Sequence, residues 1–311
     1  MSILQFKTLR PVIAFTKRIS LPGFEGIPIF NVAEFFLKAV FRGDIQIRSR
    51  AIAFSFFLAL FPSIIFLFTL IPYVPIEGFQ AQVLGLIQYL TPYNTYEAAR
   101  ETIEEIINRQ NSGLLSFGFL FALFVSTNGV NSLLNSFNRS LHYLEKRKGF
   151  KQRLVAIYLT LLLAILVFIA IVLILSTEIA LHFISIHLIN ISQSSVTLLL
   201  LGKYFVLIIL CFTAVSSLYY FGPSGGRKKW RFFSPGSILA TLLIALTSVV
   251  FNFFIQHFGQ FNKVYGSIGT LIVILIYINF NCLQLLIGFE LNNAIAKAKL
   301  TPGNNSLSSA E

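Results

Sequence analysis

The sequence predicts an all-α membrane protein with six transmembrane helices. The prediction rests on its long apolar runs, its few charges and the one-sided distribution of its basic residues. The 311 residues are 56% hydrophobic and only 12% charged. A hydrocarbon core of about 30 Å needs about 20 helical residues to cross it, and six apolar runs reach this length. The predicted spans are roughly Ala51 to Tyr73, Leu114 to Leu134, Leu154 to Ser176, Val196 to Phe221, Phe232 to Ile255 and Val264 to Phe289.

Basic residues lie almost entirely on one side of these spans. Of the 24 Lys and Arg residues, 20 precede the first span, follow the sixth, or lie in the loops after the second and fourth spans. The intervening segments hold only Arg100, Arg109 and Lys263, and Lys203 lies near the start of the fourth span. Because Lys and Arg favour the cytoplasmic face, we expect both termini in the cytoplasm.

The polar sequence outside the spans is too short for a separate soluble domain. We expect a cytoplasmic and interfacial amphipathic region over residues 1–50, a membrane domain over 51–295 and a disordered cytoplasmic tail over 296–311. The net charge of +12 is typical of basic loops that meet anionic lipids. Membrane lipids are therefore the expected partners, nucleic acid is not, and the oligomeric state stays open.

Two segments outside the spans show helical amphipathicity. Asn31 to Arg42 alternates apolar and polar residues at helical spacing, which predicts a helix lying on the inner leaflet. In the outer segment 76–112, Pro92 separates two amphipathic helices, and the second carries several glutamates. We interpret this segment as a solvated cap, with a lid over an outer opening as the alternative.

The sharpest polar signal is a row of asparagines on the second span. Asn128, Asn131, Asn135 and Asn138 are separated by three, four and three residues, which places all four amides on one helix face. This helix enters from outside, so the row occupies its cytoplasmic half. An amide without a partner in hydrocarbon is costly, so these side chains need partners.

Other polar residues are predicted at similar depth on the first and sixth spans. Pro62 frees a backbone carbonyl of its helix, which adds an acceptor there. With the asparagine row, these groups would line a polar cavity open to the cytoplasm; the alternative is that the amides only bind helix to helix. The candidates are Ser55 and Pro62 on the first span and Asn279, Asn281, Gln284 and Glu290 on the sixth.

The sequence shows no pattern typical of catalysis or metal binding. The four histidines lack acids at ligand spacing, and there is no glycine-rich phosphate loop or nucleophile elbow. Cys211 and Cys282 both lie inside apolar runs, which argues against a disulfide framework. We therefore expect no cofactor, no metal and no enzymatic activity.

Three segments resemble the YihY/BrkB family of bacterial membrane proteins: SFFLALFP at 55–62, the asparagine-rich 126–141, and the block from 235 to 295. The resemblance covers roughly residues 35–300 and implies six helices in the bacterial inner membrane. The family has the historical label ribonuclease BN. Some of its members are linked by name to serum resistance and envelope properties. The block contains Tyr265, Gly266, Ser267, Gly269, Gly288, Glu290 and Asn292.

Most of these motif residues are small and fall on the sixth span. Gly266 and Gly269 permit close helix approach or a bend. We interpret Tyr265, Gly266, Ser267, Gly269 and Gly288 as packing residues, with a hinge or gate as the alternative.

The sequence is compatible with three functions. The leading hypothesis is transport or flipping of a lipid or other amphiphilic envelope molecule along the cavity lined by the inner-half amides. The second is a noncatalytic membrane scaffold that holds envelope-biogenesis proteins. The third, an RNA-processing enzyme, lacks a supporting constellation of acids or metal ligands.

Overall fold

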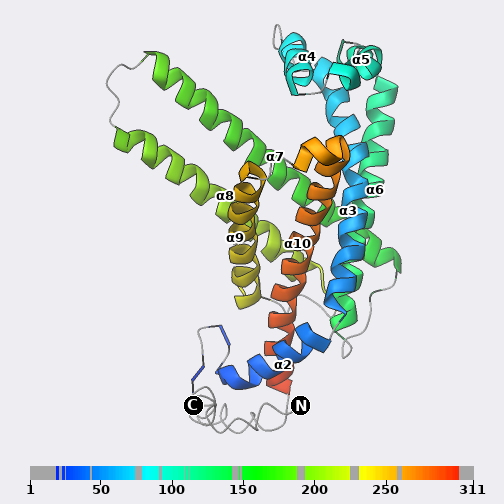
Figure 1. Ribbon diagram of the computed structural model, residues 1–311. Coiled ribbons are helices and arrows are strands. Elements are labelled where there is room, and N and C mark those ends of the chain that lie inside the picture. Colours follow the sequence, from blue (N-terminus) through cyan, green and yellow to red (C-terminus); the bar gives the residue numbers. More distant parts are fainter. Residues whose placement is uncertain are drawn as a thin grey trace.

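The fold is a bundle of helices, six of which are long and apolar enough to cross a membrane within the described part of the chain (Figure 1). The predicted fold class is thereby confirmed. The computed structural model describes residues 19, 20, 23, 24, 26–42, 44–73, 79–90, 93–108, 110, 112–141, 147, 149–187, 193–224, 231–257 and 261–300.

The membrane-crossing helices are α3, α6, α7, α8, α9 and α10. Their bounds are Ile45–Leu70, Ser112–Ser140, Gly149–His187, Gln193–Phe221, Pro235–His257 and Phe261–Leu300. The remaining elements are α2 (Ile29–Arg42), the short 3-10 helix η3 (Ile71–Tyr73), α4 (Phe79–Leu90) and α5 (Tyr93–Asn108). Helices α4 and α5 lie on either side of Pro92, as the sequence predicts.

Several helices extend past their predicted ends. Helix α3 begins at Ile45 rather than Ala51, and α10 continues to Leu300, so residues 296–300 are helical and not part of a disordered tail. Ala298 is 2% exposed, because the end of α10 packs against α2. Hydropathy falls where polar residues begin, whereas the helical hydrogen bonds continue. Residues 1–18 and 301–311 of the predicted terminal regions lie outside the described residues.

The core of the bundle lies where α3, α6, α8 and α10 meet. Helix α3 packs along both α6 and α10, and α9 packs on α10. Phe137 of α6 stacks on Phe289 of α10 with ring centroids 4.1 Å apart, and Tyr219 of α8 meets both rings edge-on. All three rings are fully buried, so they fix the relative positions of α6, α8 and α10.

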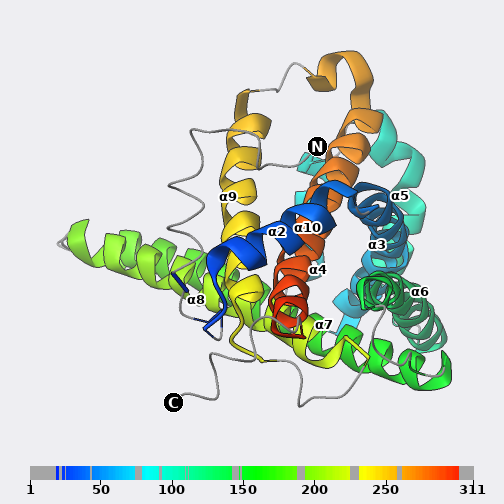
Figure 2. The ribbon, with the colours of Figure 1, turned by 90° about the horizontal axis from the view of Figure 1, so that it is seen from below.

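Helix α2 crosses the end of α10, as the view in Figure 2 shows. Val32 is 1% exposed and belongs to one buried apolar cluster with Ala294, Ile295 and Ala298 of α10. The predicted amphipathic helix therefore exists, and part of its apolar face is buried against protein. At the opposite end, α7 and α8 form an antiparallel pair that diverges from the other helices (Figures 1 and 2).

A close backbone approach joins α9 to α10. A Cβ added at Gly288 would lie 2.6 Å from the Tyr219 hydroxyl and 2.7 Å from the Cβ of Ala240, and the backbones of Gly236 and Gly288 face each other. Asn292 of α10 accepts a bond from the Gly236 amide at 2.8 Å. Gly288 therefore lies where the backbones of α9 and α10 come close together; its role as a packing residue rather than a hinge stays a prediction.

The other motif residues lie at the far end of α10. Tyr265, Gly266 and Ser267 are in its helical backbone, and their side chains lie outside the described part of the structure. Gly269 is buried.

The starts of α3 and α7 and the ends of α6 and α10 come together with α2 at one end of the bundle, which we call the basic end. The start of α3 and the end of α10 lie at the same end because six crossings, an even number, separate them. This end carries Arg48, Arg50, Arg139, Lys151, Arg153, Lys297 and Lys299. That it faces the cytoplasm stays a prediction.

Candidate functional site

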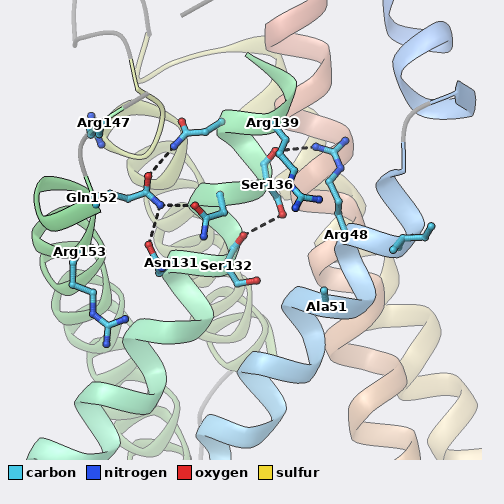
Figure 3. Close-up of a pocket in the computed structure, with 13 residues that line it drawn as sticks. Arg48, Ala51, Asn131, Ser132, Ser136, Arg139, Arg147, Gln152 and Arg153 are labelled. Atoms are coloured by element: carbon cyan, nitrogen blue, oxygen red, sulfur yellow. Dashed lines mark hydrogen bonds between the residues drawn. The ribbon is translucent and has the colours of Figure 1, made fainter. Parts of the chain in front are cut away.

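A polar cavity of about 620 Å³ opens at the basic end, with its walls supplied by α3, α6, α7 and the segment that joins α6 to α7 (Figure 3). Figure 3 shows α6 between α7, which carries Gln152, and α3, which carries Arg48. The lining residues include four arginines and no carboxylate within the described structure. They are Ile47, Arg48, Ala51, Asn131, Ser132, Asn135, Ser136, Asn138, Arg139, Arg147, Gly149, Gln152 and Arg153.

Three of the four asparagines in the row line this cavity: Asn131, Asn135 and Asn138. Asn128 lies one turn farther from the basic end and outside the lining, where its Oδ1 accepts a bond from Arg153 at 2.6 Å. The predicted one-sided row is thus real, and its inner three members face the space between α6 and α7.

Gln152 of α7 connects these three asparagines. Its Nε2 donates to the Oδ1 of Asn131 at 3.0 Å and to the Oδ1 of Asn135 at 2.6 Å. Its Oε1 accepts a bond from the Nδ2 of Asn138 at 3.2 Å. Asn138 in turn accepts a bond from the backbone amide of Ser224, at 3.0 Å. We call these five residues the amide relay; it binds α6 to α7 and to the segment after α8.

The cavity arginines differ in their partners. Arg147 donates to the carbonyl oxygens of Phe221, Gly222 and Pro223 at 2.9 to 3.1 Å, and it thereby ties the start of α7 to the end of α8. Arg153 lies over the ring of Phe124, 4.9 Å from its centroid, and it donates to the Asn128 amide. Arg139 is exposed, and the described residues include no carboxylate that pairs with it.

Arg48, which lines the cavity, forms an ion pair that is buried in the bundle. Its Nη2 lies 3.0 Å from Oε1 of Glu290, and the two side chains are 9% and 4% exposed. Arg48 Nη1 also donates at 2.8 Å to the Ser136 carbonyl and to the Ser140 hydroxyl, which itself donates to Glu290. Asn293 donates to the second Glu290 oxygen at 3.2 Å. We call these five residues the buried cluster; it joins α3, α6 and α10.

The amides predicted on α10 lie away from the cavity. Asn279 accepts a bond from Ser49 at 3.2 Å, and Asn281 donates to a carbonyl of its own helix at 2.8 Å. Gln284 donates to Thr247 of α9. None of the three is a lining residue, so the structure separates them from the asparagine row.

The candidates on α3 are also outside the lining. Ser55 donates to the carbonyl of Ala51 in its own helix at 3.1 Å, and Pro62 lies within the continuous helix α3. Glu290 borders the cavity only through its bond to Arg48. Of the ten candidate cavity residues, the structure therefore brings only Asn131, Asn135 and Asn138 into one wall.

Sequence reasoning missed the residues that complete the site, above all Gln152, Arg153 and Arg48. Arg48 and Arg153 contributed only to the count of basic residues, and Gln152 had no assigned role. Helices adjacent in sequence usually pack together, so the polar start of α7 was the place to look for partners of the α6 asparagines. Arg139 also follows Asn135 by four residues, which continues the polar face.

The described residues contain no group of three or more His, Cys, Asp or Glu side chains placed to hold a metal ion.

Six membrane-crossing helices with a cationic cavity at one end define a multi-pass membrane protein with a ligand-sized polar cavity. The chain belongs to the family described as Virulence factor BrkB, which it matches over residues 36–310. The resemblance seen in the sequence is therefore confirmed.

The names of three similar proteins describe them only as membrane proteins or as ribonuclease-like. The ribonuclease-like protein YfkH of Bacillus subtilis is 29% identical over 261 residues, which is 84% of this chain and 93% of that protein. The UPF0761 membrane protein IL2447 of Idiomarina loihiensis is 27% identical over 97 residues, 31% of this chain and 34% of its own. The UPF0761 membrane protein PSHAa0171 of Pseudoalteromonas translucida is 29% identical over 70 residues, 22% of this chain and 23% of its own. No solved structure matches the chain significantly.

Proposed function

We propose that this protein transports or flips a lipid or another amphiphilic envelope molecule, whose head group enters the cavity from the cytoplasm. In this proposal the protein lies in the bacterial inner membrane, with the basic end and both termini in the cytoplasm. The observation that carries it is the polar cavity of about 620 Å³ beside membrane-crossing helices. Ligand sites commonly have volumes of about 300 to 1,000 Å³.

The surroundings of the cavity suit an amphiphile. Phe124, one turn before the asparagine row on α6, is 58% exposed, and Ile47 on the cavity wall is 66% exposed. Apolar side chains that face outward in a membrane protein contact acyl chains. A head group bound by the polar wall would therefore leave its tails along α3 and α6, in the hydrocarbon, without desolvating the head group in lipid.

Reconstituted vesicles test this proposal. The purified protein is placed in vesicles that contain a trace of head-group-labelled fluorescent lipid, and a membrane-impermeant reductant bleaches the label on the outer leaflet. We expect the protein to expose the inner-leaflet label. Asn135→Leu, which puts an apolar group into the cavity, slows this exposure, whereas Arg50→Gln, an exposed change outside the lining, does not. Vesicles that behave like protein-free vesicles for every head group tested would contradict transport.

A second candidate is a noncatalytic scaffold for envelope-biogenesis proteins. The amide relay favours it, because its bonds join α6 to α7 as polar contacts do in membrane bundles. Crosslinking followed by purification from native membranes separates the two. A stoichiometric protein partner supports the scaffold, and isolation as a lipid-loaded single species supports transport.

We propose that the chain does not cleave RNA, despite the name of its Bacillus relative. The cavity wall offers guanidinium and amide groups in place of the carboxylate and histidine ligands that metal-assisted hydrolysis uses. Incubation of purified protein with RNA decides the matter. Cleavage that a single cavity substitution removes would contradict this proposal.

A further inference from the structure

We propose that the cavity selects an anionic, phosphate-bearing group, because the amide relay turns two asparagine NH2 groups into the cavity beside Arg139. The inference deepens the proposed function, since it names the head-group class of the transported molecule. The anion site rests on its own geometry, however, and can be tested without any transport.

The first step is that the backbone N–H of Ser224 determines the orientation of every side-chain carboxamide in the relay. The Ser224 N–H can only donate, so the atom of Asn138 that meets it is the oxygen. Asn138 must then offer its NH2 to Gln152, whose oxygen accepts it. Gln152 is left with its NH2, and both of its hydrogens are used by the oxygens of Asn131 and Asn135.

The second step concerns the groups that remain. Because each Oδ1 accepts a bond from Gln152 and is thereby turned toward α7, the Nδ2 groups are the donors that Asn131 and Asn135 keep for a ligand. Neither Nδ2 finds an acceptor among the described residues, and both side chains line the cavity. The relay therefore fixes which end of each amide meets Gln152, and it leaves the two Nδ2 groups as donors without a partner among the described residues.

The third step is charge. Arg139 and Arg153 line the same cavity, and their contacts in the described structure are with neutral groups or none. Glu290, which bonds to Arg48 of the cavity wall, is already paired with that arginine. The charges of Arg139 and Arg153 are thus not compensated by a carboxylate among the described side chains.

Together these steps identify the ligand class. A phosphate group carries several acceptor oxygens, which suit a guanidinium fork and two amide donors. A head group that adds an ammonium, such as choline, would bring a second positive charge against a wall that already carries Arg139 and Arg153, which disfavours it. The phosphate could belong to an anionic lipid or to a soluble compound, and the two sources need separate measurements.

The experiment compares the two sources with the full-length protein. In the lipid arm, native mass spectrometry counts lipids retained from equal mixtures of phosphatidylglycerol and phosphatidylcholine. In the soluble arm, inorganic phosphate is titrated calorimetrically against the protein in phosphatidylcholine nanodiscs. We expect preferential retention of phosphatidylglycerol, and weak or absent binding of inorganic phosphate. Phosphate binding without lipid preference would support the same site with a soluble ligand.

Two variants with matched controls locate the site. Arg139→Gln removes the charge, and Asn135→Asp keeps the oxygen that Gln152 needs while it replaces the free NH2 by a second oxygen. Each is expected to weaken anion binding about tenfold. Arg50→Gln and Gln46→Glu make the same chemical changes on exposed α3 positions outside the lining, and they should leave binding unchanged. Thermal unfolding of each variant excludes misfolding, and Arg139 is exposed, so its replacement spares the fold.

The outcomes separate this inference from transport. Equal binding of both lipids with no effect of Arg139→Gln or Asn135→Asp would overturn the anion site. Lipid movement that ignores both head-group charge and Arg139→Gln would overturn it as well, while transport survives. Selective anion binding without movement would keep the site and contradict transport.

Discussion

Helix α6 presents polar side chains to two neighbours at the basic end, and the two sides differ in how far their hydrogen bonds are closed. Toward α3 and α10, Ser136 and Ser140 belong to the buried cluster, where both Glu290 oxygens are bonded. Toward α7, the bonds that Asn131 and Asn135 make within the described structure go through their oxygens. The same helix therefore carries a closed contact on one side and an open one on the other.

The difference shows how polar residues in a membrane protein can be sorted. A closed set satisfies its own donors and acceptors, so it stabilises helix contacts and has nothing left for a ligand. A set with unused donors beside a cavity is costly unless water or a ligand occupies it. The number of polar residues is similar in the two cases, and they differ in whether each donor and acceptor has a hydrogen-bond partner.

Breaking the buried cluster should have the largest effect on stability. Glu290→Ala leaves the Arg48 guanidinium buried without its counter-charge, which should lower the free energy of unfolding by about 3 to 5 kcal/mol. Thermal unfolding of the detergent-solubilised protein measures it. Glu101→Gln, on the exposed surface of α5, is the control and should change little. Equal stability of Glu290→Ala and wild type would mean that this side is not closed as described.

Widening the close approach of α9 to α10 should give the next largest loss of stability. Gly288→Ala places a methyl group 2.6 Å from the Tyr219 hydroxyl and should destabilise the protein by about 1 to 3 kcal/mol. Gly202→Ala on α8 is the matched control, since no atom lies within 4 Å of its added Cβ. There the helix should be unchanged or slightly more stable. The same unfolding assay compares the pair, and equal losses in both variants would contradict the packing role.

The relay side should be the least sensitive in stability. Gln152→Leu removes three interhelical hydrogen bonds, each worth about 0.6 kcal/mol or a little more in a membrane bundle. We expect a loss of about 1 to 2 kcal/mol by thermal unfolding. The variant frees Asn131 and Asn135 to rotate. The preference for phosphatidylglycerol should therefore be largely lost, although the protein stays folded. A loss as large as that of Glu290→Ala would show that the relay serves mainly as structure.

Much of the fold was predictable because membrane insertion is governed by local properties. Six apolar runs predicted six helices, Pro92 predicted the separation of α4 and α5, and the spacing of the asparagines predicted their common face. Helix ends were less predictable. Ile45 and Leu300 mark helices that continue into polar sequence, where backbone hydrogen bonding outlasts hydropathy.

The site was predictable only in part, since it depends on which helices touch. The asparagine row predicted a polar face. The sequence near these residues does not indicate that Gln152 bonds to them, or that Arg48 pairs with Glu290, 242 residues away in the chain. Equal depth in the membrane suggested that Asn279 and Gln284 share the cavity. The structure instead directs them to Ser49 and Thr247, because depth does not specify rotation about the helix axis.

Thiol accessibility tests the contrast between the two sides of α6 most directly. Single cysteines are placed at Asn135 and Ser140 in a background where Cys211 and Cys282 are replaced by alanine, and a membrane-impermeant reagent is applied to vesicles of each orientation. We predict rapid labelling at position 135 from the side of the basic end, and slow labelling at position 140, which is 7% exposed. Equal labelling at both positions, or labelling at 140 alone, would contradict an open relay beside a closed cluster.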